Sequence, residues 1–483
     1  MTDLNTNTDH ARASELATRL RAQIRGAVFT PSDAEYADAV AGWNLRIARR
    51  PAVVAVPERE ADIGAIVREA GRVDMRVTVS STGHGALSDL ANTLLIRTTR
   101  LTGVEMVASD RVRIQAGATW QQVLDVTAPL GLAALCGAAP DVGAVGYLTG
   151  GGLGPFARTY GLSSDWVRLF EVVTGDGVPR TVSAQSNPEL FWALRGSKGS
   201  LGIVTAVELE VPSLSSFYGG AVFFAAEDIP RVLHAWAEWC TDLPKNANTS
   251  VALLRLPPAP GIPEPVAGTP TLALRYTWVG SAEQGAQIVA PMLATASPVL
   301  GEFAERPYRE IGLVHADPVD PMPVVESGAL LRNLPAGAVN ALLSVAGPST
   351  TSPQLSVELR LLGGSVQSDD HSCIRHRHAG FNLFTVAVAA SDEARTIAQD
   401  HSAKIHEELW HWATGTTQPN FCFDQHPSST LRTYSEETLD RLERLISVRD
   451  PHGVIAEGHR IGEALAWAGR GRPTAQSNDE GAE

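Results

Sequence analysis

Residues 137–161 read GAAPDVGAVGYLTGGGLGPFARTYG, a stretch in which glycine recurs every few positions. Each interior glycine costs a helix about 1 kcal/mol relative to alanine, so this density argues against a regular helix. Backbone without side chains can approach a large planar ligand closely. The stretch therefore predicts an irregular segment that contributes to a binding surface.

A second loop of small residues, SSTGHG (80–85), follows the strand-like MRVTVS (75–80). Its backbone N–H groups can converge on an anion, because no bulky side chain interferes. His84 has no second metal-ligand residue nearby, which argues against a metal site. Neither loop has the spacing of a Rossmann fingerprint or of a P-loop, and either one alone could be a simple turn.

The pattern around these loops predicts two kinds of sheet. PAVVAVP (51–57), a helical pattern over 58–73, and MRVTVS form a strand–helix–strand unit, and TLLIRTT (93–99) adds another strand. Residues 168–182 predict a hairpin around Gly175–Gly177. After about residue 212, helical patterns separate five candidate strands of an antiparallel sheet. These candidates are 218–226, 250–257, 271–280, 355–364 and 381–390.

The order of the pieces is more specific than any single piece. The series resembles the FAD-binding domain of the vanillyl-alcohol-oxidase superfamily, and within it the berberine-bridge-enzyme-like oxidoreductases. The resemblance is continuous over about 51–212 and weaker beyond. The matching residues are Gly83 and His84; Gly117; Pro140, Val142, Gly143, Gly146 and Gly150 to Gly154; Arg158, Tyr160, Gly161 and Asp165; Glu171 to Gly177; Asn187 to Gly196; and Gly202 to Thr205.

The resemblance implies an α+β fold in which a two-part FAD-binding domain encloses a substrate domain built on an antiparallel sheet covered by helices. The expected divisions are an N-terminal helix and tail (1–29, with the first 12 or so residues disordered), the FAD-binding domain (30–212), the substrate domain (213–425), a C-terminal return to the FAD domain (426–470) and a disordered tail (471–483).

The resemblance also implies the cofactor. In the family, the histidine of this loop is bonded covalently to the 8α-methyl of FAD, so His84 is the expected tether, and the loop N–H groups are expected to hold the pyrophosphate. A neutral imidazole is nucleophilic near neutral pH. The expected cofactor-binding residues are Ser80, Ser81, Thr82, Gly83, His84, Gly85, Pro140, Val142, Gly143, Gly146, Gly150, Gly151, Gly152, Gly154, Gly202, Ile203 and Val204.

Many relatives add a second, cysteinyl bond to the flavin. Here Ala139 stands at that position, in AAPDVG, which favours the histidyl-only branch that includes 6-hydroxynicotine oxidase. Cys136, three residues earlier, remains an alternative second tether, and otherwise it is a buried structural thiol.

The catalytic residues follow less directly. The family's late tyrosine is replaced by Gln418 in QPNFCF. Histidyl-only relatives carry acidic side chains on a strand that covers the flavin, and VELRLLGG places Glu358 and Arg360 on one strand face. The pair could be a base, a substrate clamp or a structural ion pair. Tyr147 is expected near the flavin, as packing or as a substrate contact.

Two histidine-rich segments predict no metal site. HSCIRHRH (371–378) has no partner pair at metal spacing, so we expect an exposed loop. HEELWH (406–411) is one residue longer than a zinc-binding HExxH, which separates His406 and His411 around a helix. Trp236 and Trp239 have helical spacing and are expected to be core residues.

Composition limits the remaining possibilities. The 483 residues carry a net charge of −14, which argues against nucleic-acid or anionic-membrane partners. No signal peptide or membrane span is evident, and four scattered cysteines favour a cytoplasmic protein with free thiols. The family resemblance implies an FAD-dependent oxidoreductase, an oxidase rather than a dehydrogenase, that passes electrons from a small alcohol, amine or natural-product intermediate to O2. The alternatives are an oxidative cyclase or tailoring enzyme of secondary metabolism, or a degenerate protein that only binds flavin or another ligand.

Overall fold

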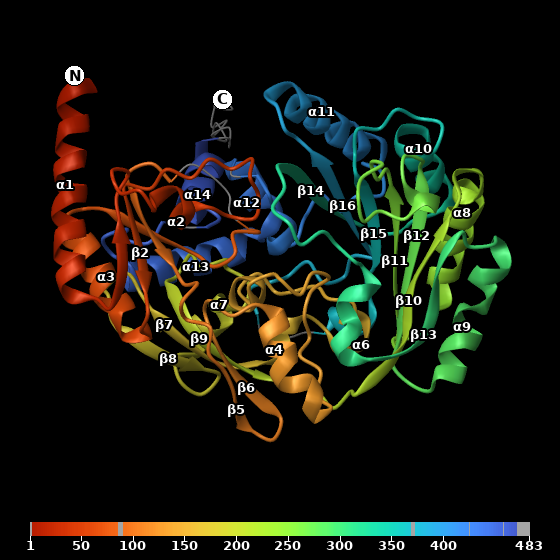
Figure 1. Ribbon diagram of the computed structural model, residues 1–483, viewed down its shortest axis with the longest axis horizontal. Helices are drawn as coiled ribbons and strands as arrows, with labels where there is room; N and C mark the ends of the chain where they lie inside the picture. The colour runs from red at the N-terminus through yellow and green to blue at the C-terminus, as the bar shows by residue number, and fades with distance from the viewer. Residues whose placement is uncertain (1, 86–89, 369–371, 425, 457, 471–483) are drawn as a thin grey trace, which may run out of the picture.

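The computed structural model describes residues 2–85, 90–368, 372–424, 426–456 and 458–470. Its strands form three sheets (Figure 1). Two smaller sheets lie beside the N-terminal helix, and one large sheet lies at the other end of the molecule. The tail expected to be disordered, 471–483, lies outside the described residues.

The first two sheets are built from the N-terminal part of the chain. The four-stranded sheet has the order β1-β2-β4-β3, in which β4 runs parallel to both β2 and β3. The five-stranded sheet has the order β5-β6-β9-β7-β8 and is antiparallel, with β7 and β8 forming the expected hairpin. Their strands are β1 (Gly26–Phe29), β2 (Val53–Pro57), β3 (Arg76–Ser80), β4 (Thr93–Arg97), β5 (Val104–Ala108), β6 (Arg111–Gln115), β7 (Val167–Val173), β8 (Pro179–Ser183) and β9 (Ile203–Glu210).

The third sheet is seven-stranded and antiparallel, with the order β13-β10-β12-β11-β15-β16-β14. Five of its strands were expected, whereas β13 and β14 were missed. The strands are β10 (Ser216–Phe224), β11 (Ala247–Leu254), β12 (Thr271–Trp278), β13 (Leu300–Pro307), β14 (Val324–Leu331), β15 (Ser356–Leu361) and β16 (Phe381–Val388).

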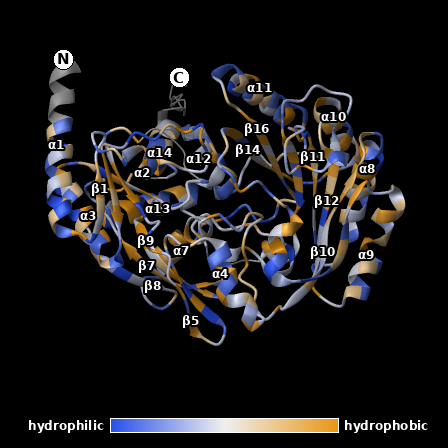
Figure 2. Cartoon of the chain, viewed as in Figure 1, coloured by the Kyte–Doolittle hydropathy of each residue, from blue (hydrophilic) through white to orange (hydrophobic). Residues whose placement is uncertain are grey.

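Helices cover one face of the large sheet. α8, α9, α10 and α11 lie along its outer side, where apolar residues of strands and helices form one core (Figures 1 and 2). Trp236 of α8 is fully buried there, as expected. The helices are α1 (Thr2–Gln23), α2 (Tyr36–Val40), α3 (Glu60–Arg72), α4 (Trp120–Thr127), α5 (Ala144–Leu148), α6 (Ala157–Tyr160), α7 (Pro188–Leu194), α8 (Ile229–Trp239), α9 (Ala282–Thr295), α10 (Ala336–Ala346), α11 (Asp392–Glu408), α12 (Pro427–Thr433), α13 (Glu436–Arg449) and α14 (Ile461–Arg470).

Local sequence explains where several helices begin. Ser281, Ser391 and Ser435 precede α9, α11 and α13, and each hydroxyl accepts a hydrogen bond from a first-turn backbone N–H. The N-terminal helix is longer than expected, because α1 begins at Thr2 and includes the residues expected to be disordered.

The C-terminal segment returns to the N-terminal sheets. The backbone N–H of Val77, in β3, donates to the Val454 carbonyl, and the N–H of Ala456 donates to the Val77 carbonyl. The Tyr434 hydroxyl donates to the Gly196 carbonyl at 2.7 Å. The α+β architecture with a helix-covered antiparallel sheet is thus as expected, and the exact domain boundaries stay a prediction.

No helix within the described residues is long and apolar enough to cross a bilayer.

Candidate active site

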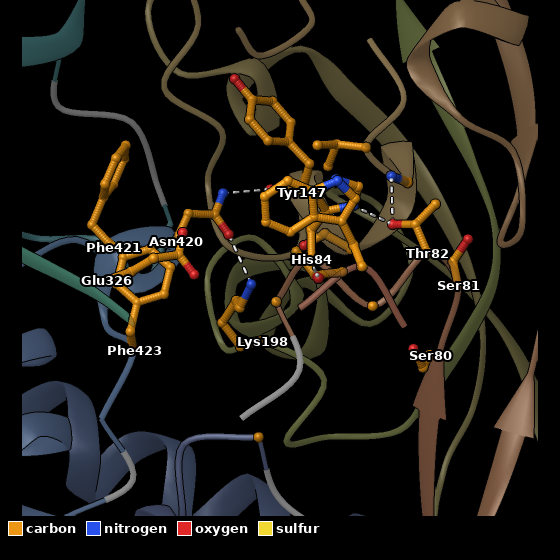
Figure 3. Close-up of a pocket in the computed structure, with 18 of the residues that line it drawn as sticks. Ser80, Ser81, Thr82, His84, Tyr147, Lys198, Glu326, Asn420, Phe421 and Phe423 are labelled. Carbon is orange, nitrogen blue, oxygen red and sulfur yellow. Dashed lines mark hydrogen bonds between the residues drawn. The ribbon is translucent and has the colours of Figure 1, made fainter. Parts of the chain in front are cut away.

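A cavity of about 610 Å³ lies between the small-residue loops and the uncovered face of the seven-stranded sheet. The 80–85 loop, the start of α5 and Lys198 form one wall (Figure 3). Arg275 of β12 and alternate residues of β15, β16 and β14 form the other. This volume falls in the range of small-molecule and cofactor sites.

His84 lies at the wall of this cavity with its side chain 18% exposed. Its ring stacks on Trp43, with the centroids 4.8 Å apart. Nδ1 lies 2.8 Å from the Thr82 hydroxyl, and Nε2 lies 3.2 Å from an Asp141 carboxylate oxygen. The Trp43 ring and the Thr82 hydroxyl therefore hold the imidazole in one orientation, while Nε2 is buried without a hydrogen-bond partner among the described residues.

Glycine is required at position 83 of this loop. Gly83 has φ +85°, and a Cβ there would lie 2.9 Å from Gly42 Cα. The Trp43 N–H donates to the Thr82 carbonyl, so this close approach fixes the loop against residues 42–43. A side chain at position 83 would displace the loop that carries His84.

Two buried arginines meet beside Ser80. Arg49 and Arg97 each donate to the Ser80 hydroxyl, at 3.0 and 3.1 Å. Burial and the neighbouring charge of Arg49 lower the pKa of Arg97 to about 10. Within the described residues, neither guanidinium forms an ion pair, and Arg49 Nη2 is buried without a hydrogen-bond partner. Neither arginine was identified from the sequence.

Part of the expected cofactor-binding set lines the cavity and part does not. The lining members are Ser80, Ser81, Thr82, Gly83, His84, Gly85, Val142, Gly143, Gly146 and Ile203, together with Tyr147, Glu358 and Arg360. Pro140, Gly150, Gly151, Gly152, Gly154, Gly202 and Val204 are not among the lining residues.

Close packing explains the glycines that lie off the cavity. A Cβ on Gly152 would lie 2.5 Å from the Tyr147 ring, and one on Gly154 would lie 2.2 Å from the Cys136 carbonyl oxygen. A Cβ on Gly202 would lie 2.5 Å from the Val173 carbonyl oxygen. These glycines therefore let backbone and ring pack together behind the wall, a role that spacing alone cannot separate from ligand contact.

Lys198 extends this wall toward the large sheet. Its Nζ donates to Asn420 Oδ1 at 2.9 Å, and Asn420 Nδ2 donates to the Tyr147 carbonyl at 2.9 Å. Burial lowers the pKa of Lys198 to about 8. Gln418, which stands where relatives carry a tyrosine, is buried and does not line the cavity.

On the opposite wall, Glu358 belongs to a buried charge network. Arg275 Nη1 donates to Glu358 Oε1 at 2.7 Å, and Arg360 Nε donates to Oε2 at 2.8 Å. The Ser250 hydroxyl also donates to Oε1, and His315 Nε2 lies 3.3 Å away. Glu358 and Arg360 do share one strand face, as alternation requires, but sequence reasoning missed Arg275.

These partners determine the ionisation of Glu358. Burial alone would raise its pKa, but Arg360 and Arg275 hold the pKa of Glu358 well below its usual range. A carboxylate so stabilised accepts a proton poorly. The geometry therefore favours a Glu358 that fixes two guanidinium groups at the cavity wall.

A further carboxyl, Glu326 of β14, also faces the cavity and was missed (Figure 3). The signal was present, since Val324 and Glu326 alternate on one strand face, but the expected strands did not include this segment.

Segment 372–378 is packed into the fold, so the exposed loop expected there is wrong. Cys373 and Ile374 are buried, and Arg377 makes two hydrogen bonds with Asp165, at 2.7 and 2.8 Å. The segment is buried because its apolar residues pack into the fold and because Arg377 is paired with Asp165, which lies far away in the sequence. Residues 369–371 lie outside the described residues. Among the residues that the structure describes, no group of three metal-ligand side chains occurs.

Breaking this pair should destabilise the protein. Asp165→Asn replaces the carboxylate that accepts two hydrogen bonds from the buried Arg377 with a neutral amide, and we expect a loss of about 3 kcal/mol in the free energy of unfolding. Urea unfolding measures it. The control is Glu189→Gln, which breaks the exposed Arg441 pair and should cost under about 1 kcal/mol. Equal losses in the two variants would contradict this account.

Cys136 is buried and does not line the cavity, whereas Ala139 does. Burial raises the pKa of the Cys136 thiol to about 12, so it remains a thiol at neutral pH.

The residues present fit an FAD molecule. Arg49, which lines the cavity, and Arg97 beside it form no ion pair with any carboxylate in the described part of the chain, so their charge suits a diphosphate. The Cβ-free backbone at Gly143 and Gly146 leaves room for a ring system beside His84. When bound, FAD would supply a hydride acceptor at this wall.

Comparison with known proteins agrees with this assignment. Residues 51–183 match the FAD binding domain family. An FAD-linked oxidoreductase of Dictyostelium discoideum is 23% identical over 88% of this chain and 91% of that protein. (R)-6-hydroxynicotine oxidase of Paenarthrobacter nicotinovorans is 34% identical, but over 42% of this chain and 44% of that protein.

Solved structures share the fold over almost the whole chain. 6-Hydroxy-D-nicotine oxidase of Arthrobacter nicotinovorans has a TM-score of 0.78 at 22% identity, covering 91% of this chain and 98% of that one. Glucooligosaccharide oxidase of Acremonium strictum, which carries a 6-S-cysteinyl, 8α-N1-histidyl FAD, has a TM-score of 0.77 at 20% identity, covering 92% and 98%.

The FAD binding domain match and the FAD-linked relatives identify an FAD-dependent oxidoreductase. The chain shares its overall fold with solved structures of 6-hydroxy-D-nicotine oxidase and of a berberine-bridge-like enzyme.

Proposed function

We propose that this protein is a mono-covalent flavoprotein oxidase that removes a hydride from a small alcohol, amine or natural-product intermediate and passes the electrons to O2. The carrying observation is the position of His84, held by Trp43, Thr82 and Asp141 at the wall of the cavity. The histidyl FAD of the fungal oxidase of like fold supports this reading. A cytoplasmic location stays a prediction.

The two walls of the cavity would bind different molecules. The loop wall would bind the flavin, and the sheet wall would bind substrate, with Arg360 and Arg275 offering fixed positive charge. Tyr147 contributes its ring and its backbone carbonyl rather than an acidic hydroxyl, since burial raises the pKa of that hydroxyl. We propose Glu358 as the residue that positions the two arginines.

The test begins with the purified protein. A yellow band that persists after denaturation indicates an attached flavin. Anaerobic bleaching by candidate alcohols and amines, followed by hydrogen peroxide formation on admitting air, identifies an oxidase. Bleaching that air does not reverse, while an artificial acceptor does, would indicate a dehydrogenase. A flavin that no candidate reduces would favour the degenerate binding protein.

The single tether makes a separate prediction. Cys136→Ser should leave the flavin absorption spectrum and the amount of attached flavin unchanged, because the buried thiol does not reach the cavity. Absorption spectra and mass spectrometry of the peptide that contains Cys136 check this. A flavin mass on that peptide would overturn the mono-covalent proposal.

A further inference from the structure

Glu326 lies on the substrate side of the cavity, on a strand that carries one acidic residue. In β14 and the neighbouring β16, alternate residues face the cavity: Val324 and Glu326 from one, Phe384 and Val386 from the other. Glu326 pairs in register with Val386, and Gly328 pairs with Phe384. The missing side chain at Gly328 leaves Phe384 and Glu326 as diagonal neighbours.

No cation in the described part of the chain neutralises this carboxyl. Among the described residues, no ion pair or hydrogen bond reaches the Glu326 side chain. β16 has no titratable side chain, and His406 of α11 contacts Ser327, on the opposite strand face. Across the cavity, Arg275 and Arg360 are held by Glu358, and Lys198 is held by Asn420, while Asp317 adds negative charge.

Burial is therefore not opposed by a positive charge, and it raises the pKa of Glu326 to about 8. Near neutral pH a carboxyl group of this kind releases its proton when a cation binds beside it, because the positive charge lowers its pKa.

Three phenyl rings lie at the same part of the cavity (Figure 3). Phe384 contacts Phe421 edge to face, with the centroids 5.4 Å apart, and stacks on Phe423 at 5.6 Å. Arg360 lies over the Phe421 ring, 5.6 Å from its centroid, so a protein cation already occupies that face of Phe421. A carboxyl beside aromatic faces is the combination that binds alkylammonium groups.

We infer that Glu326, Phe384, Phe421 and Phe423 form a cation-accepting subsite, so that the substrate of the proposed oxidase carries a basic nitrogen on an apolar or aromatic body. This narrows the proposed function, on which it rests, from alcohols and amines to amines. The ammonium group of such a substrate would pair with the Glu326 carboxylate, which has no cationic partner among the described residues. The phenyl rings would cover the carbon atoms bonded to the nitrogen.

The experiment uses two probes of equal shape. Benzyltrimethylammonium carries a permanent charge, and neopentylbenzene is its neutral isostere. Calorimetric titration of the flavin-loaded full chain at pH 6.5 to 9.5, in two buffers of different ionisation enthalpy, gives affinity and proton release together. The variants are Glu326→Gln and, as a control, Glu302→Gln, an exposed carboxyl on the edge strand β13.

The wild type should bind the cation about tenfold or more tightly than the isostere at pH 9, where Glu326 is ionised. Affinity should fall below about pH 8, and binding near pH 7 should release close to one proton, because the cation requires the ionised carboxyl. Glu326→Gln should abolish both the preference and the proton release, and Glu302→Gln should preserve both.

Equal binding of the two probes by the wild type, or an unchanged preference in Glu326→Gln, would overturn the inference. Binding of the cation near pH 7 without proton release would also overturn it, because the cation requires the ionised carboxyl. If Glu326→Gln fails to fold, the number of protons that the wild type releases on binding the cation is sufficient to test the inference. Heat and protons are followed rather than flavin chemistry, so this test can fail while the oxidase proposal stands, and the reverse.

Discussion

Replacing His84 with alanine is expected to release the flavin from covalent attachment completely. Alanine has no ring nitrogen with which to bond the flavin. Acid precipitation should then leave yellow flavin in the supernatant, whereas the wild-type pellet stays coloured. Flavin reduction should also slow by roughly tenfold, about 1.4 kcal/mol in the barrier, since the tether raises the reduction potential.

The control is His376→Ala, a half-buried histidine away from the cavity, which should retain attached flavin. Mass spectrometry of the wild-type peptide that contains His84 should show the added flavin mass. An unmodified peptide from a yellow, active preparation would remove the tether. Flavin that stays attached in His84→Ala would place the bond elsewhere.

Glu358→Gln should produce the largest loss of stability, about 3–5 kcal/mol in the free energy of unfolding. The amide cannot neutralise Arg275 and Arg360, which are 7% and 13% exposed at their side chains. Since the arginines hold the folded-state pKa of Glu358 below the unfolded value of about 4.3, the carboxylate stabilises the fold above that pH. The difference between wild type and variant, measured by urea unfolding, should shrink as pH falls below about 4.

Kinetics then separate the two roles considered for Glu358. If the residue is the catalytic base, Glu358→Gln slows flavin reduction roughly 10²–10⁴-fold with the flavin still attached. If it positions the arginines, as the contacts favour, Arg360→Ala and Glu358→Gln both weaken substrate saturation with little change in the limiting rate. Reduction within a few-fold of wild type at saturation would exclude the base.

The sequence predicted the loop wall of the cavity better than the sheet wall. The 80–85 loop and the segment around Gly143 and Gly146 present mainly backbone to the cavity, and a backbone surface leaves a glycine pattern that can be read directly. The same pattern also marks Gly152 and Gly154, which instead admit Tyr147 and the Cys136 carbonyl. The spacing of glycines indicates that the backbone approaches another group closely. Only the packed structure shows whether that group is a ligand or another part of the protein.

The substrate side depends on side chains brought together from four strands. Arg275 lies in TLALRYTW, which reads as a buried strand, and an arginine inside such a run was itself a signal for a buried partner. Its partner is 83 residues away, so no local pattern connects them. Arg49 and Arg97 converge on Ser80 for the same non-local reason.

The two walls of the cavity also differ in how freely they can change over evolutionary time. On the large sheet, Phe384 and Glu326 face the cavity outside the Glu358 charge network, while the neighbouring Leu383 belongs to the helix-covered core. One substitution at such a position alters the charge or shape presented to a substrate and leaves the loops around His84 untouched. A lineage can therefore acquire a new substrate without passing through forms that have lost the cofactor. This lets one flavin-holding scaffold diversify by ordinary point mutation.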